Sequence, residues 1–148
     1  MRISEILVPK RTLCDVSTGS KKAALEIVSN LIASADSSLI QTEVFSSLIS
    51  REKLGSTGLG NGIALPHGRL KYCQNTLGAF VRLQTGVDYD AIDQKPVDLL
   101  FALLVPKKST QEHLNILANL AKMFSNNESV EELRRVQSRD EVFSLLVS

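Results

Sequence analysis

The stretch "VDLLFALLVP", residues 97–106, decides the fold class that the sequence predicts. Apart from Asp98 it is apolar, and Pro106 ends the run. A strand with one face in water alternates apolar and polar residues, whereas a strand covered on both faces is apolar throughout. The stretch therefore predicts a buried strand inside a layered fold, with other elements packed on both of its sides.

Shorter stretches before and after it supply the other predicted elements. Alternation or short apolar runs predict strands at residues 11–16, 63–65 and 76–85. Apolar residues at helical spacing predict helices at residues 21–35, 42–55, 109–126, 128–136 and 138–147. Capping signals support four of these ends: Ser20 and Thr42 as starts, Gly55 as a stop, and a start at the capping box of Ser109 with Glu112.

Helices and strands interleave along the chain, which has 148 residues, the usual length of one domain. We therefore expect a single α/β domain over residues 1–148, built around one central sheet. Periodicity alone does not give the order of the strands.

Composition excludes several classes of partner and site. The net charge is +1, and aromatic residues make up 5% with no tryptophan, which argues against a nucleic-acid partner. Basic doublets such as Lys21-Lys22 are scattered and predict solvated surface. Two histidines and two cysteines far apart, Cys14 and Cys73, offer little from which to build a metal site. The N-terminus lacks a secretion signal and no apolar run is long enough to span a bilayer, so we expect a cytoplasmic protein without membrane insertion.

The segment "REKLGSTGLGNGIALPHGRL", residues 51–70, holds five of the eight glycines: Gly55, Gly58, Gly60, Gly62 and Gly68. Glycine lets backbone N–H groups approach an anion closely, so the loop is a candidate phosphate cradle. The residues proposed for it are Gly55, Ser56, Thr57, Gly60, Asn61 and Gly62. The spacing fits neither G-x-x-x-x-G-K-S/T nor a dinucleotide-binding loop, and a plain surface turn is the alternative.

His67 follows this loop directly after Pro66. Proline fixes its own φ and biases Leu65 to an extended backbone, so we expect His67 on a stiff support at the end of a strand. A neutral imidazole is a competent nucleophile near pH 7. Its second nitrogen needs a hydrogen-bond acceptor to set the tautomer, and the sequence does not identify that acceptor.

Two more residues are candidates for the same site. His113 lies in the first turn of the predicted 109–126 helix, where free N–H groups welcome an anion, and a packed structural histidine is the alternative. Arg51 ends the predicted helix before the loop and can bind a phosphate bidentately, or be an ordinary surface arginine. Arg69 is a weaker candidate for that task or for docking a partner.

The segment "EKLGSTGLGNGIALPHG", residues 52–68, resembles the active-site motif of enzyme IIA proteins of the bacterial phosphoenolpyruvate-dependent phosphotransferase system, in the fructose/mannitol/nitrogen-regulatory class. The matching positions run from an acidic residue to the histidine and its glycine: Glu52, Leu59, Gly60, Ile63, Ala64, Leu65, Pro66, His67 and Gly68. Similarity continues in "AIDQKPVDLLFALLVP", residues 91–106, and the whole chain looks most like the stand-alone nitrogen-regulatory branch.

This resemblance implies a central mixed sheet with helices on both sides and a site without metal or organic cofactor. His67 would accept a phosphoryl group, through Nε2, from a histidine phosphocarrier protein. His113 would hydrogen-bond the phosphoryl oxygens, and Arg51 would stabilise their charge. The phosphorylation state would regulate target proteins such as sensor kinases or potassium transporters.

Two other readings stay open. The chain would serve a fructose- or mannitol-type sugar permease if it passes the phosphoryl group to a cysteine of a IIB domain. It would be an interaction module if His67 does not react.

Overall fold

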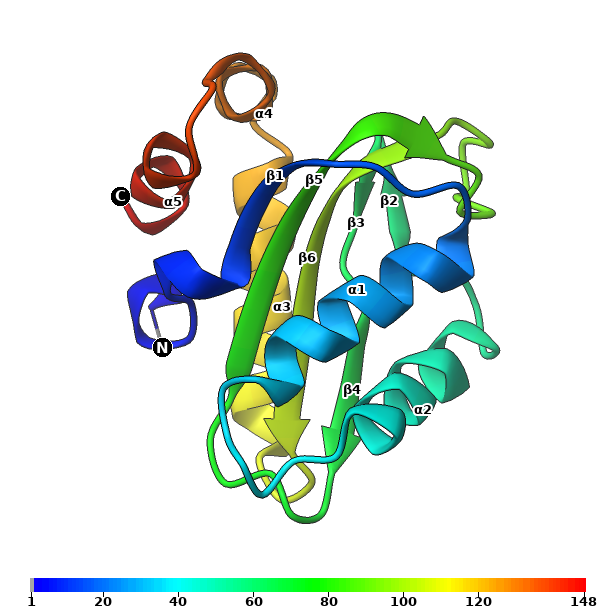
Figure 1. Cartoon of the computed structure of the whole chain (residues 1–148), viewed down its shortest axis with the longest axis vertical. Helices are drawn as coiled ribbons and strands as arrows, with labels where there is room; N and C mark the ends of the chain where they lie inside the picture. Colours follow the sequence, from blue (N-terminus) through cyan, green and yellow to red (C-terminus); the bar gives the residue numbers. More distant parts are fainter. Residues whose placement is uncertain (1) are drawn as a thin grey trace.

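Strand β6, Val97–Pro106, lies in the middle of a six-stranded sheet in the computed structural model, which describes residues 2–148 (Figure 1). Strand β5, Leu77–Val87, pairs antiparallel with one edge of β6. The other edge of β6 pairs in parallel with two short strands in turn, β3 (Ile63–Ala64) and β4 (His67–Leu70). The sheet is completed by β1 (Thr12–Val16), parallel to β5, and β2 (Gly58–Gly60), antiparallel to β3.

Helices cover both faces of this mixed sheet, which confirms the predicted α/β class (Figure 1). One face carries α1 (Lys21–Ala33) and α2 (Gln41–Glu52). The other carries α3 (Thr110–Phe124), α4 (Asn127–Arg135) and α5 (Arg139–Val147), with two short 3-10 turns, η1 (Ile3–Glu5) and η2 (Pro9–Arg11). Within residues 2–148, no helix has the length and apolar character needed to cross a membrane.

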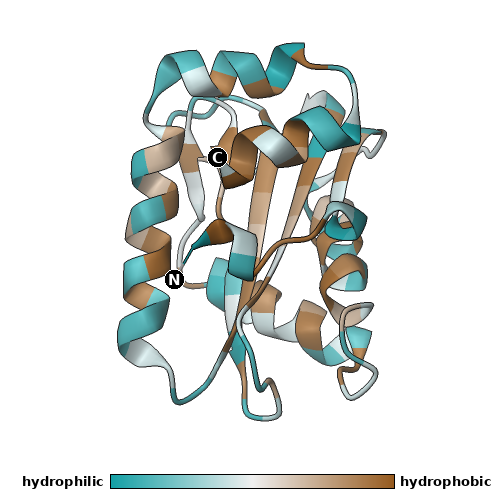
Figure 2. Ribbon diagram, turned by 90° about the vertical axis from the view of Figure 1, so that its left-hand side faces the viewer, coloured by the Kyte–Doolittle hydropathy of each residue, from teal (hydrophilic) through white to brown (hydrophobic). Residues whose placement is uncertain are grey.

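Strand β6 shows why its sequence is apolar throughout. Leu100, Ala102 and Leu104 pack into the core formed with α1 and α2, and they are fully buried. Their neighbours Leu99, Phe101 and Leu103 pack into the second core, under α3 to α5, and are also fully buried. Successive side chains on a strand point to opposite faces, so a strand between two cores needs apolar residues at every position. Figure 2 shows this hydrophobic interior between the more hydrophilic outer surfaces of the helices.

The predicted elements appear in the structure, but two predicted caps are wrong. The N-cap residue of α2 is Ile40 and the helix begins at Gln41, so Thr42 lies inside the helix. No side chain makes a capping hydrogen bond at this helix start. Ser109 precedes α3 but makes no capping hydrogen bond, because its ψ of 59° is outside the extended region that N-cap residues use. The capping box is instead at α5, between Ser138 and Glu141.

Helix α2 also ends earlier than predicted. Its last residue is Glu52, and Gly55 follows in the turn, where its N–H still donates to the Glu52 carbonyl at 3.1 Å. The turn carries the chain from α2 into β2 and so toward the histidine motif.

Candidate functional site

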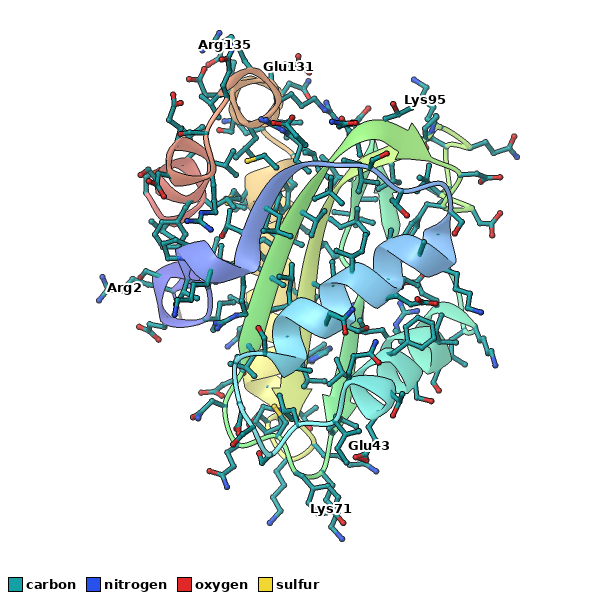
Figure 3. The ribbon with its side chains drawn as sticks, viewed as in Figure 1. Arg2, Glu43, Lys71, Lys95, Glu131 and Arg135 are labelled. Carbon is teal, nitrogen blue, oxygen red and sulfur yellow. The ribbon has the colours of Figure 1, made fainter. Side chains whose placement is uncertain are left out.

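An open pocket of about 620 Å³ lies where β4 is flanked by α2 and α3. It brings together Arg51 from α2, His67 from β4 and His113 from α3, the three side chains that the sequence singled out. The remaining lining residues come from α2, the turn that follows it and β4: Glu43, Ser46, Ser47, Ser50, Leu54, Gly68, Arg69 and Leu70. Figure 3 places Glu43 at the end of the molecule where β4 and β6 finish.

His67, predicted at the end of a strand, is the first residue of a new strand, β4, and β3 already ends at Ala64. Pro66 has no N–H and interrupts the ladder between β3 and β4. Its carbonyl still accepts from the Leu103 N–H at 2.9 Å, so the chain stays aligned with β6 and pairing resumes at His67. Strand β6, with which β4 pairs, is buried along most of its length.

The structure supplies the acceptor that the sequence left unidentified. The Nδ1 atom of His67 lies 2.7 Å from the carbonyl oxygen of Leu65. A carbonyl oxygen can only accept, so Nδ1 carries the proton in the neutral ring. The lone pair of the imidazole is therefore on Nε2, the nitrogen that the family resemblance favours for reaction.

His67 is neutral at pH 7 in this environment. Burial lowers its pKa below the ordinary 6.5, and the charges of Arg51 and Arg69 act in the same direction. The hydrogen bond to Leu65 and the charge of Glu52 oppose this shift without reversing it. The neutral form is the one with a free lone pair, so the environment favours the nucleophilic state.

His113 faces His67 across the pocket. Their ring centroids are 5.2 Å apart and their planes are tilted by 59°. The side chain is only 5% exposed, and its Nδ1 atom has no hydrogen-bond partner within residues 2–148. Burial, followed by the charges of His67, Arg69 and Arg51, lowers the pKa of His113 to about 4. Both rings are therefore neutral at pH 7.

Arg51 lies in the last turn of α2, as predicted, with its guanidinium group near the histidines. One amino group, Nη1, donates to the carbonyl of Gly55 at 2.8 Å, which ties the side chain to the turn after the helix. Arg69 also lines the pocket, from the far end of β4, and its charge acts on both histidine rings. The pocket therefore offers positive charge beside two neutral imidazoles.

The predicted phosphate cradle does not lie at this pocket: none of its six residues lines it. Asn61 and Gly62 line a separate pocket on the turn between β2 and β3, where Asn61 N–H donates to Asp93 and the Asn61 carbonyl accepts from Arg134. The glycines serve the turn itself, because Gly60 and Gly62 have φ of +96° and +82°, which side chains rarely tolerate.

The first part of the cradle is used within the protein. The N–H of Gly55 donates to the Glu52 carbonyl at 3.1 Å, and the N–H of Thr57 donates to the Glu52 carboxylate at 3.2 Å. These amides already have acceptors and are not free to bind an anion. Within residues 2–148, no three His, Cys, Asp or Glu side chains are grouped so that they could hold a metal ion.

Sequence reasoning missed a buried group beside the pocket. Glu52, at the acidic first position of the motif, is 8% exposed and forms an ion pair with Lys21 at 2.9 Å. Lys21 is therefore not the solvated surface residue that its doublet predicted. The available signal was that Glu52 occupies the acidic position of the motif. The partners of its carboxylate lie on α1 and after β5, far away in the sequence, so only the fold identifies them.

Comparisons with known proteins agree with the motif. Residues 5–148 match the family model described as "Phosphoenolpyruvate-dependent sugar phosphotransferase system, EIIA 2". The nitrogen regulatory protein of Pseudomonas aeruginosa is 44% identical over 147 residues, covering 99% of this chain and 96% of that protein. The fructose-specific EIIA component of Haloferax volcanii is 32% identical over 127 residues, covering 86% and 82% of the two chains.

A solved structure gives the same result at the level of the fold. The crystal structure of nitrogen regulatory protein IIA-Ntr from Neisseria meningitidis is 46% identical and superimposes with a TM-score of 0.92, covering 97% of this chain and 98% of that one. As the motif around His67 predicted, this chain belongs to the EIIA 2 family of the phosphoenolpyruvate-dependent sugar phosphotransferase system.

Proposed function

We propose that this chain is a phosphohistidine carrier with a regulatory role, in which Nε2 of His67 takes a phosphoryl group from a phosphohistidine on a histidine phosphocarrier protein. The observation that carries the proposal is the contact between His67 Nδ1 and the Leu65 carbonyl, at 2.7 Å, because it holds the Nε2 lone pair ready in a pocket that also contains Arg51 and His113. Family membership over residues 5–148 supports the same chemistry.

The transfer balances without any further reagent. The Nε2 lone pair of His67 forms a new N–P bond as the donor's N–P bond breaks, and the electron pair of the broken bond returns to the donor imidazole. The Nδ1 proton of His67 stays on its hydrogen bond to Leu65. Phosphoryl transfer mainly needs the protein to position the reactants and stabilise charge, so no metal or organic cofactor is part of the proposal.

Arg51 and His113 share the charge of the transferring group in this proposal. The guanidinium of Arg51 supplies a permanent cation next to the phosphoryl oxygens. Nδ1 of His113 is buried, so Nε2 is the nitrogen available to donate a hydrogen bond to an oxygen. In the unphosphorylated protein the pKa of about 4 keeps His113 neutral, so its donation adds no repulsion to Arg51.

Intact-mass spectrometry tests the proposal directly. The protein is incubated with phosphoenolpyruvate, the general phosphotransferase enzyme and the phosphocarrier, and we expect one acid-labile, base-stable phosphate. His67→Ala removes it and leaves the fold intact, since His67 lies at an open pocket and not in either core. His113→Ala slows acceptance, roughly a hundredfold or more for loss of one charge-stabilising donor, without abolishing it.

The outcome that contradicts the proposal is equally plain. A folded His67→Ala protein that still takes up one phosphate would place the nucleophile elsewhere. No phosphate on the wild-type protein, with the cascade shown to be active on another acceptor, would favour an interaction module whose histidine does not react.

The regulatory role rests on the nitrogen regulatory relatives, at 44% identity. Phosphorylation adds up to about two negative charges at the pocket, which is enough to change which proteins bind there. On family resemblance we expect this chain to act in the cytoplasm and its targets to be proteins such as sensor kinases or potassium transporters. We take residues 1–148 to act as one IIA domain.

A sugar-transport role is the second candidate, because one relative is named as a fructose-specific EIIA component at 32% identity. The two roles differ in the next acceptor. Incubation of the phosphorylated protein with fructose- or mannitol-type IIB domains separates them: we expect no rapid transfer to a IIB cysteine, and complete transfer within seconds would favour the transport role.

A further inference from the structure

A buried hydrogen-bond network lies behind the candidate site, centred on the carboxylate of Glu52. Oε1 accepts from the Thr57 N–H at 3.2 Å and pairs with Lys21 Nζ at 2.9 Å. Oε2 accepts from the Thr57 hydroxyl and from the Tyr89 hydroxyl, the latter at 3.3 Å. The four side chains come from α1, α2, the turn before β2 and the segment after β5. We call Lys21, Glu52, Thr57 and Tyr89 the Glu52 network.

Three of the four members are closed to solvent, and the Lys21 side chain is 20% exposed. Glu52 is 8% exposed, Thr57 6% and Tyr89 0%. Lys21 supplies the compensating charge and also lies 4.5 Å above the centre of the Tyr89 ring. Burial and the Glu52 charge raise the pKa of Tyr89, so its hydroxyl stays protonated and remains a donor to the carboxylate. Such a network holds one geometry, because any displaced member leaves a buried polar group unpaired.

One backbone path connects this network to the nucleophile. The carbonyl of Thr57, whose N–H and hydroxyl are both held by Glu52, accepts from the Leu65 N–H at 3.0 Å. The carbonyl of Leu65 in turn accepts from Nδ1 of His67. Glu52 therefore fixes Thr57, Thr57 fixes Leu65, and Leu65 fixes the tautomer of His67.

A second path connects the network to the cation of the site. Arg51 precedes Glu52 in the last turn of α2 and donates to the Gly55 carbonyl. The Gly55 N–H donates to the carbonyl of Glu52 at 3.1 Å, so the turn that holds the guanidinium begins at Glu52. Glu52 thus holds the Thr57 side through its carboxylate and the Arg51 side through its main-chain carbonyl.

We propose that Glu52 is a positioning residue for the phosphoryl-transfer site, acting through Thr57 and Leu65 on the tautomer and orientation of His67. This rests on the proposed function above. Glu52 does not line the pocket, so it acts without touching the phosphoryl group or the donor protein.

The test uses the full chain and two readouts. Nitrogen-15 NMR of the unphosphorylated protein distinguishes a protonated from an unprotonated ring nitrogen and reports the His67 tautomer. Rates of phosphoryl acceptance at varied phosphocarrier concentration separate kcat from KM. In Glu52→Gln, which keeps the shape but loses the charge and one acceptor, we expect the Nε2–H tautomer to become populated. We also expect kcat to fall roughly tenfold, in line with small misplacements of reacting groups, with KM nearly unchanged.

Matched variants separate positioning from stability. Asp98→Asn weakens another ion pair, with Arg134 at 2.9 Å, on the separate pocket at the β2–β3 turn. We expect it to lower stability comparably while leaving the His67 tautomer and kcat unchanged. Tyr89→Phe removes one donor to Glu52 and keeps the ring under Lys21, so we expect a smaller effect in the same direction as Glu52→Gln.

The results that overturn the proposal are distinct from those that overturn the function. A folded Glu52→Gln protein with wild-type tautomer and kcat would make Glu52 a purely structural residue. So would equal losses of kcat in Glu52→Gln and Asp98→Asn. If the wild-type protein accepts no phosphate, the proposed function fails, and the NMR comparison still decides whether Glu52 sets the tautomer.

Discussion

At the scale of single residues, the site is built by placing ordinary groups in unusual surroundings. His67 has its Nδ1 proton held by a backbone carbonyl, and burial together with Arg51 and Arg69 lowers its pKa. His113 is more deeply buried, with its pKa lowered to about 4. An arginine is cationic at any working pH, so the pocket keeps its positive charge while both rings stay neutral.

We predict that His67 titrates below pH 6.5 in the unphosphorylated protein and that acceptance persists at pH values where an exposed histidine is half protonated. The reason is the sign of its shift: a lowered pKa keeps the neutral, nucleophilic form present to lower pH. NMR titration of the two histidine rings measures the midpoints separately. A His67 midpoint at or above 6.5 would contradict the argument, and His67→Ala assigns the signals.

At the scale of elements, the contact between α2 and β4 sets the width of the site. Ser47 of α2 donates through its hydroxyl to the Arg69 carbonyl at 3.1 Å, and Gly68 lies directly against it. A Cβ at Gly68 would lie 2.1 Å from the Ser47 Oγ atom and 3.0 Å from its backbone carbonyl carbon. Glycine at this position therefore permits the helix that carries Arg51 to approach the strand that carries His67.

We predict that Gly68→Ala displaces α2, lowers the free energy of unfolding by about 1–3 kcal/mol, as overpacking usually does, and slows phosphoryl acceptance. Urea unfolding and the mass-spectrometric assay measure the two effects. The matched control is Gly19→Ala, because a Cβ there meets nothing within 4 Å. Equal behaviour of the two variants would show that α2 does not rely on this close approach.

At the scale of the whole molecule, burying two neutral histidines links folding to pH. Both pKa values are lowered from 6.5 in the folded chain, so below pH 6.5 the unfolded chain binds more protons on these rings, and for His113 this window extends down to about pH 4. Stability therefore rises with pH in this window and is lost as the pH falls through 6.5.

We predict that wild-type protein is less stable at pH 5 than at pH 7 and that His113→Gln reduces this difference. The histidine contribution is on the order of 1 kcal/mol, because His113 borders an open pocket and water offsets part of the burial. Urea unfolding at the two pH values gives the comparison. An unchanged pH difference in His113→Gln would show that His113 does not carry the linkage.

The sequence by itself determined the elements and the chemistry. The apolar run of β6 predicted cover on two faces, helical spacing located the five helices, and the motif around His67 identified the family and singled out His67 as the candidate nucleophile. These inferences succeed because burial and backbone restriction act locally, residue by residue. The predicted caps at Thr42 and Ser109 were wrong, because capping depends on backbone angles that the neighbouring elements set.

Only the tertiary structure decided which groups meet. Strand β4 and helix α3 bring the ring centroids of His67 and His113 to 5.2 Å from each other. In the chain these two elements are separated by β5 and β6. The tertiary structure also places the turn of Gly60 and Gly62 at a pocket away from the histidines. It brings Glu52 into contact with Lys21 and Tyr89. The physical reason is that strand order and helix packing arise from long-range burial, which no local pattern encodes.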